Sequence, residues 1–256
     1  MTSPDRSVPT PEAWELNVLG VYDFVSPHPT TGLEEWFAFL DRSAHLTGDV
    51  CEFGVFRGRS LVGAALMLAQ KGDERRVIGF DTFAGFPALA HEDLPERFEE
   101  MAERGQLTQE HLARVRRNAE LLEATGRSID PMRSSTSGAF DATSRELIEE
   151  RAALVGVADR ITLFEGDFKD SLRLPENEER IVSAVLIDSD LYDGYAHVLP
   201  WAWERMQPGG MIYLDEYYSL KFPGPRIAVD EFCAAHSVRP TMLRRDGSFE
   251  RWAILR

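Results

Sequence analysis

The stretch SAVLIDSDLYDGYAHVLPWAWERMQPGGMIYLDEYY, residues 183–218, decides the predicted fold. Two short apolar runs in it, 184–187 and 211–214, each stop at acidic residues. These residues are Asp188 and Asp190 after the first run, and Asp215 and Glu216 after the second. Short apolar runs closed by polar residues are typical of buried parallel strands. The sequence therefore predicts two neighbouring strands with acidic ends.

The segment between these two strands has the pattern of a helix. Apolar side chains recur at helical spacing over 193–206, and residues 207–210 read as the turn that ends the helix. A strand, helix, strand unit makes the two strands parallel, so their carboxyl ends meet at one edge of the sheet, where α/β proteins bind ligands. Asp188, Asp215 and Glu216 would repel each other there unless a cation lies between them, which predicts a divalent metal site.

Other polar residues of this stretch have simpler interpretations. Asp190 and Asp193 are predicted to cap the following helix, with a ligand role as the alternative. His197 is predicted to lie on the surface, with a role as second base as the alternative.

Length and composition narrow the class of protein. The 256 residues suffice for one core plus appendages, and a net charge of −15 argues against nucleic acid or an anionic membrane as partner. No run approaches the length of a membrane span and the first residues lack a signal-peptide core, so we expect a cytoplasmic protein. Cys51 and Cys233 lie in apolar surroundings without metal-ligand spacing and are predicted to be buried thiols.

The chain begins with a predicted extension, residues 1–47, before a main domain over 48–256. Residues 1 to about 12 are polar and rich in proline, and 16–25 are mostly apolar. Thr31 and Glu34 form a predicted capping box for an amphipathic helix over 31–46.

A predicted nucleoside site follows. The strand 50–53 contains Glu52 and leads into a turn with Gly54 and Gly58; a helix over 60–70 and a second strand ending at Asp81 come next. Glycines let the backbone approach a ligand, and an acid at this distance is placed to accept hydrogen bonds from ribose hydroxyls. Phe56 interrupts the glycine pattern of nicotinamide enzymes, which argues against a dehydrogenase.

The remaining segments complete an α/β pattern. Residues 90–140 are too long for a plain connection and are predicted to form a helical insertion that covers the site like a lid. Its basic residues Arg114, Arg116 and Arg117 are expected to be a solvated face, with a phosphate contact as the alternative.

The chain closes with a predicted helix over 226–236 and a hairpin about Asp246 and Gly247. We therefore predict a Rossmann-like α/β fold with helices on both faces of a mostly parallel sheet and a C-terminal antiparallel hairpin, the architecture of class I methyltransferases.

Five motifs together resemble one enzyme family. They are CEFGVFRG, GFDTFAGFP, EGDF, LIDSDLYDGY and MQPGGMIYLDEYY, at residues 51–58, 79–87, 165–168, 186–195 and 206–218. In this order they resemble the macrocin O-methyltransferase family, metal-dependent enzymes that use S-adenosylmethionine to methylate sugar hydroxyls in natural-product pathways. The resemblance implies a seven-stranded class I methyltransferase sheet, the cofactors S-adenosylmethionine and Mg²⁺, and a homo-oligomer.

The resemblance also implies site residues. Those implied for the cofactor are Glu52, Gly54, Phe56, Gly58, Asp81, Thr82, Asp167 and Phe168. Asp188, Asp215 and Glu216 match the metal-ligand positions, although the family commonly has Asp at the third. Asp188 is also our predicted base for the acceptor proton, since it ends a central strand.

The expected reaction is methyl transfer to a hydroxyl of a deoxysugar, either nucleotide-linked or attached to an aglycone. One alternative places the methyl group on a catechol-like or other small diol, since any vicinal diol can chelate a metal. Another is a non-catalytic nucleotide-binding protein on the same fold. In every case the expected partner is a small molecule.

Overall fold

The structure, a computed structural model, describes residues 32–134, 139–246 and 249–256. Thr31 and most of the predicted N-terminal extension, including 16–25, lie outside these residues. Among the described helices, none is both long enough and apolar enough to cross a bilayer.

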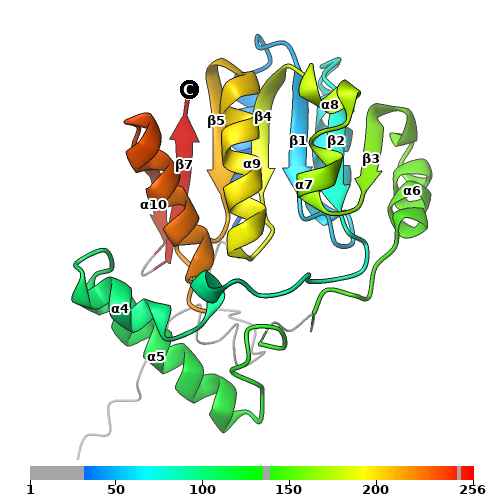
Figure 1. Cartoon of the computed structure of the whole chain (residues 1–256). Coiled ribbons are helices and arrows are strands. Elements are labelled where there is room, and N and C mark those ends of the chain that lie inside the picture. The colour runs from blue at the N-terminus through cyan, green and yellow to red at the C-terminus, as the bar shows by residue number, and fades with distance from the viewer. Residues whose placement is uncertain (1–31, 135–138, 247–248) are drawn as a thin grey trace, which may run out of the picture.

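A seven-stranded sheet forms the centre of the molecule, with the order β3-β2-β1-β4-β5-β7-β6 (Figure 1). The strands are β1 (Asp49–Phe53), β2 (Val77–Asp81), β3 (Ile161–Glu165), β4 (Val182–Ile187), β5 (Met206–Leu214), β6 (Thr241–Asp246) and β7 (Phe249–Leu255). The first five pair in parallel, β7 runs antiparallel to β5, and β6 pairs antiparallel with β7. The predicted class I methyltransferase fold with its C-terminal hairpin is confirmed.

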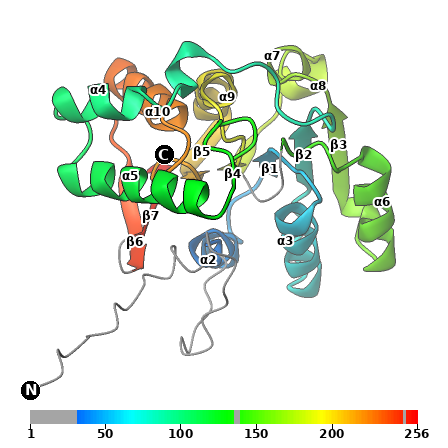
Figure 2. The same cartoon turned by 90° about the horizontal axis from the view of Figure 1, so that it is seen from below.

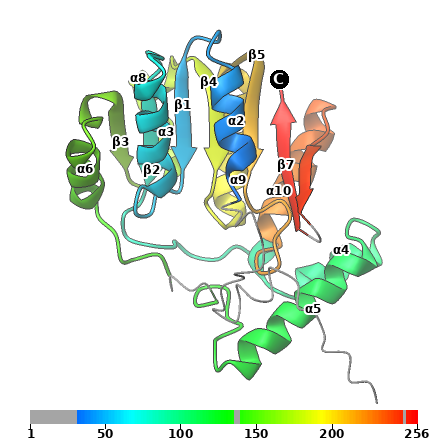
Figure 3. The ribbon, with the colours of Figure 1, turned by 180° about the vertical axis from the view of Figure 1, so that it is seen from behind.

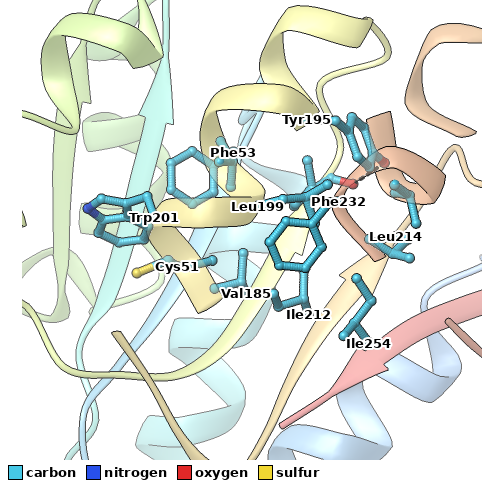
Figure 4. Close-up of a cluster of buried hydrophobic side chains, with 14 of the residues drawn as sticks. Cys51, Phe53, Val185, Tyr195, Leu199, Trp201, Ile212, Leu214, Phe232 and Ile254 are labelled. Atoms are coloured by element: carbon cyan, nitrogen blue, oxygen red, sulfur yellow. Dashed lines mark hydrogen bonds between the residues drawn. The ribbon is translucent and has the colours of Figure 1, made fainter. Parts of the chain in front are cut away.

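Helices cover both faces of the sheet. One layer holds α2 (Glu34–Arg42), α3 (Arg59–Gln70) and α6 (Arg145–Leu154), seen in front in Figure 3. The other holds α7 (Phe168–Ser171), α8 (Pro175–Glu178), α9 (Tyr192–Arg205) and α10 (Gly224–His236). Successive strand side chains point to opposite faces, so each central strand needs apolar residues at consecutive positions. In β1, Cys51 and Phe53 pack in the α9 and α10 layer (Figure 4), and Val50 packs in the α2 and α3 layer.

Two predicted element boundaries are wrong. Glu34 is the first residue of α2, and Leu33 is the N-cap without a side-chain hydrogen bond, so the capping-box register does not hold. The predicted turn 207–210 belongs to β5, which begins at Met206 directly after α9. Residues 207–210 form an irregular part of this strand, in which the backbone pairs with Arg256. Gly209 N donates to Arg256 O at 2.9 Å, and Arg256 N donates to Gly210 O at 3.0 Å.

Residues 90–134 contain the short helix η1 (His91–Asp93), then α4 (Arg97–Glu103) and α5 (Gln109–Ala124). Figure 1 shows α4 and α5 below the sheet, and the view from below in Figure 2 shows them on the side of β7 and α10. A small separate core of Phe98, Met101, Ala102, Leu107 and Leu112 joins the two helices, and Ile227 of α10 packs against it. The predicted helices are therefore present, and they pack beside one half of the carboxyl edge.

Candidate active site

The carboxyl ends of β1, β2, β4 and β5 meet at one edge of the sheet and line two cavities. The first has a volume of about 1110 Å³ and is lined by Gly54, Phe56, Gly58, Asp81, Thr82, Asp167, Phe168, Asp188 and Asp215, among others. The second, of about 290 Å³, lies between the 215–222 segment, α5 and β7. Asp190 and Asp215 line both cavities, so the two spaces adjoin at these carboxylates.

The turn after β1 has three left-handed residues, Gly54 (φ +89°), Phe56 (φ +47°) and Gly58 (φ +74°). A Cβ at Gly54 would lie 1.9 Å from the carbonyl oxygen of Asp188, so only glycine lets the turn pass the end of β4. Asp188 N in turn donates to Phe53 O at 2.8 Å. The turn and the end of β4 are thus in direct contact.

Asp81 is held by the backbone of this turn. Its Oδ2 accepts hydrogen bonds from Val55 N at 2.6 Å and Phe56 N at 2.8 Å, and its Oδ1 accepts one from Phe83 N at 2.8 Å. Oδ2 has both of its lone pairs engaged, whereas Oδ1 has one left, so Asp81 can still accept one bond from a ligand in the first cavity.

Glu52 is placed differently from the other predicted cofactor residues. It is 1 % exposed, does not line the first cavity, and points into the α3 layer, where Ser60 Oγ donates to its Oε1 at 2.6 Å. Burial raises the pKa of Glu52 to about 8. Glu52 therefore lies behind the glycine turn rather than at its surface.

The remaining predicted cofactor residues also line the first cavity. Thr82 Oγ1 donates to Gly85 O at 2.8 Å, and Asp167 caps α7 by accepting from Lys169 N at 3.0 Å. The Phe168 ring meets the Phe53 ring edge-on, with centroids 5.3 Å apart. The loop after β2 and the loop after β3 are therefore both held by internal hydrogen bonds where they line this cavity.

The three predicted metal ligands come together as expected from the topology. One side-chain oxygen each from Asp188, Asp215 and Glu216 lies within 4.8 Å of the others. Burial and the neighbouring Asp215 charge raise the pKa of Asp188 and of Glu216 well above the usual carboxyl range. Three hard oxygen donors at this spacing, with strong mutual repulsion, fit a hard divalent cation such as Mg²⁺. Arg251, with Nη1 at 3.9 Å from Asp215 Oδ1, offsets only part of the charge.

Asp190 and Asp193 do not cap α9, so that prediction is wrong. The N-cap position is Leu191 without a side-chain bond, and Tyr192 N instead donates to Asp93 Oδ1 at 2.8 Å. Asp93 is fully buried and comes from η1, 99 residues earlier in the chain. No local pattern indicates a cap supplied from such a distance.

Asp190 does not cap α9 and instead lines both cavities, so it is a site residue to which the sequence interpretation gave only an alternative role. It is 9 % exposed and its backbone is left-handed, with φ +61°, which is unusual for a residue other than glycine and is concentrated at functional sites. Burial raises the pKa of Asp190 to about 7, although the charge of Lys221 opposes the shift. The Asp-x-Asp spacing after β4 was the available signal.

His197 is exposed, as predicted; its Nδ1 contacts Asp193 O at 2.7 Å, and it also lines the first cavity.

The second cavity is closed on one side by α5. His111 Nε2 contacts Ser219 O at 2.7 Å, Arg114 Nη1 donates to Tyr218 Oη at 2.7 Å, and Asn118 Nδ2 donates to Leu220 O at 3.2 Å. These three residues lie on successive turns of one helix face. The helix therefore holds the segment that follows Asp215 and Glu216.

The basic residues of α5 have protein partners. Arg116 pairs with Glu99 at 2.6 Å and Arg117 with Glu120 at 3.1 Å, and these four side chains are about half exposed or more, as expected for a solvated face. Arg114 differs, since it pairs with Glu110 at 2.6 Å and bonds Tyr218.

Comparison with known proteins identifies the class. A family model described as a methyltransferase domain matches residues 51–217, which include the glycine turn, both strand ends and the three carboxylates. The chain belongs to this methyltransferase family. It is an S-adenosylmethionine-dependent O-methyltransferase, as the motifs predicted.

Two relatives carry more specific names. Mycinamicin III 3''-O-methyltransferase of Micromonospora griseorubida is 25% identical over 208 residues, covering 80% of this chain and 68% of the relative. The 8-demethyl-8-(2,3-dimethoxy-alpha-L-rhamnosyl)-tetracenomycin-C 4'-O-methyltransferase of Streptomyces olivaceus is 25% identical over 206 residues, covering 80% of this chain and 65% of the relative. These two relatives confirm the predicted resemblance to sugar O-methyltransferases of natural-product pathways.

Solved structures share the fold. The O-methyltransferase NovP aligns with a TM-score of 0.60 at 20% identity, covering 88% of this chain and 78% of its own. The calicheamicin methyltransferase CalS11 aligns with a TM-score of 0.57 at 20% identity, covering 100% and 94%. At these identities the similarity concerns the fold alone.

Proposed function

We propose that this protein is a Mg²⁺-dependent O-methyltransferase of a sugar hydroxyl, acting on a natural-product deoxysugar that is nucleotide-linked or attached to an aglycone. The observation that carries the proposal is the meeting of two cavities at Asp190 and Asp215, beside the three-carboxylate group. A methyl donor and an acceptor must approach a single point, and this junction provides one. The names of the two relatives support a glycosylated acceptor.

The first cavity would hold S-adenosylmethionine. Its volume lies above the usual range for small-molecule sites, and it is lined by a glycine turn and by Asp81, whose free lone pair on Oδ1 suits a ribose hydroxyl. Asp167 and Phe168 would lie by the adenine. Glu52 would act from behind, by holding Ser60 at the start of α3.

The second cavity would hold the reacting end of the acceptor. It joins polar groups, including Lys221, Ser219 and Asn118, to aromatic walls such as Phe249, a combination that suits a sugar ring with one polar edge. The α4–α5 insertion would exclude water from this side, because α5 bonds the cavity wall at three points.

The metal would be held by Asp188, Asp215 and Glu216. When bound, it would lower the pKa of an acceptor hydroxyl and fix the hydroxyl toward the donor. In the transfer, a bond forms between the acceptor oxygen and the methyl carbon as the carbon–sulfur bond breaks, and the hydroxyl proton passes to a carboxylate.

Asp190 is better placed than Asp188 to take this proton. Asp188 lines only the first cavity and belongs to the metal-ligand group. Asp190 lines both cavities and is outside that group. A left-handed backbone holds it in this position. We therefore assign Asp188 to metal binding and Asp190 to the base, which changes the expectation from sequence.

Calorimetry and chelation test the proposal. The protein should bind S-adenosylhomocysteine, lose turnover after exhaustive chelation, and recover it with Mg²⁺. Turnover that survives chelation would contradict the metal assignment while leaving the enzyme class intact.

A panel of acceptors tests the substrate. Deoxysugar nucleotides and glycosylated natural products should be methylated, and catechols should not be. Preference for catechols would favour the small-diol alternative. Self-association and a cytoplasmic location stay predictions, and native mass measurement would test the first.

A further inference from the structure

Tyr195, on the second turn of α9, is fully buried in the apolar cluster of Figure 4, and its hydroxyl bonds the ends of both acidic strands. Its hydroxyl donates toward Ile187 O at 2.8 Å and toward Glu216 Oε2 at 3.1 Å, and it accepts a hydrogen bond from Glu216 N at 3.1 Å. Ile187 directly precedes Asp188, and Glu216 directly follows Asp215. One oxygen atom thus lies between the two strand ends that carry the carboxylates.

A hydroxyl has one proton, so Ile187 O and Glu216 Oε2 compete for it. Ile187 O already accepts a hydrogen bond from Asp215 N at 3.1 Å, so it keeps a partner when the proton turns away. Within the described residues, Tyr195 is the neutral donor to Glu216 Oε2, the other close neighbours of this carboxyl group are Asp188 and Asp215, and Glu216 is 8 % exposed. A buried carboxylate oxygen without a second donor therefore needs this proton more than the carbonyl does.

We infer that Tyr195 is a positioning residue that orients the Glu216 carboxylate for metal binding. The hydroxyl holds Glu216 at two points, its backbone N–H and one carboxylate oxygen, and leaves the other carboxylate oxygen for the cation. Glutamate has one more rotatable bond than aspartate, so without this contact its carboxylate would sample more orientations. The inference rests on the proposed metal-dependent function.

Contacts of this kind behind a ligand typically change metal affinity by about 10- to 100-fold when removed. Tyr195→Phe keeps the ring in the apolar cluster and removes only the hydroxyl. Tyr213→Phe is a matched control, because Tyr213 is equally buried and its hydroxyl donates to a backbone oxygen, Gly32 O at 2.6 Å, rather than to a carboxylate.

The experiment measures Mn²⁺ binding to the full-length protein by electron paramagnetic resonance, with S-adenosylhomocysteine affinity measured in parallel. Tyr195→Phe should weaken Mn²⁺ binding by about 10-fold or more, with nucleoside affinity within about twofold of the wild type. Tyr213→Phe should leave Mn²⁺ affinity unchanged. Equal Mn²⁺ affinity in Tyr195→Phe and wild type would overturn the inference but not the metal site, whereas a wild type that binds no Mn²⁺ would overturn both.

A double-mutant cycle with Glu216→Asp tests whether Tyr195 acts through this carboxylate. The shorter side chain withdraws the carboxylate from the hydroxyl, so Tyr195→Phe should change Mn²⁺ affinity less than about twofold in that background. The same loss in both backgrounds would show that the hydroxyl acts elsewhere, which would contradict the inference.

Discussion

The glycine turn after β1 and the acidic ends of β4 and β5 lie at the same edge of the sheet, but the negative charge of their carboxylates is stabilised differently. In the turn, the single carboxylate of Asp81 accepts three backbone N–H bonds. At the strand ends, three carboxylates approach within 4.8 Å, and their cationic neighbour Arg251 is at 3.9 Å. The first region is satisfied by its own backbone, whereas for the second we propose that a cation from outside offsets the charge.

This difference also separates the roles that we assign. A preformed turn suits a cofactor that is common to many enzymes, because its ligand groups come from one β–α–β unit. The backbone at the end of β4 contacts the turn, but the acidic side chains also depend on α5, α9 and β7, which are distant in the chain. Substitutions on the two sides should therefore have separable effects.

The largest expected effect is on turnover, from the acidic side. Asp190→Asn should lower kcat by about 10²- to 10⁴-fold through loss of the base, with unchanged Mn²⁺ affinity. Asp188→Asn should lower kcat at least as much and also weaken Mn²⁺ binding, since it removes a ligand. Both variants should bind S-adenosylhomocysteine normally. Near-normal turnover of Asp190→Asn would return the base to Asp188.

The next effect concerns the glycine turn. Asp81→Asn replaces one carboxylate oxygen by an NH2 group, which cannot accept a hydrogen bond. At least one of the three backbone N–H bonds to Asp81 is therefore lost, and a ribose contact is weakened. A loss of about 1–3 kcal/mol, or about 5- to 150-fold in S-adenosylhomocysteine affinity, is expected. Calorimetry measures it, and Mn²⁺ affinity serves as the control. If Mn²⁺ affinity fell instead, the two regions would not be separable.

A smaller effect is expected where α5 meets the second cavity. Asn118→Ala removes the hydrogen bond to Leu220 O, worth about 1 kcal/mol, and should raise the KM for the acceptor by about fivefold. S-adenosylhomocysteine affinity should not change. Thr125→Ala, at the end of the same helix and outside both cavities, is a suitable control. A raised KM in the control alone would argue against the proposed acceptor cavity.

The last expected effect concerns stability and pH rather than binding or turnover. The pKa of Glu52 is raised to about 8 in the folded protein, so between about pH 5 and 8 unfolding releases its proton and stability falls as pH rises. Glu52→Gln keeps an acceptor for Ser60 and removes this contribution. The Tm of the variant, relative to wild type, should therefore rise over this range, by about 2–4 °C for each kcal/mol. Parallel Tm curves across the range would contradict a buried, protonated Glu52.

Much of the site could be predicted because its signals are local. An apolar run that stops at an acid marks the end of a parallel strand, as at Asp81, Asp188 and Asp215. Parallel topology then brings these ends together without further information. Glu52 was also predicted to contact the cofactor, but side-chain alternation along β1 points it toward the α3 layer, where Ser60 donates to it.

By itself, the sequence determined the α/β fold, the glycine turn and the edge at which the carboxylates meet, because strand length, side-chain alternation and turn chemistry act over a few residues. Only the tertiary structure decided that Asp93 caps α9, that Asp190 lies between two cavities, and that Tyr195 holds Glu216. Each of these depends on packing between distant segments, where a hydrogen bond forms because burial leaves a polar group no water to bind.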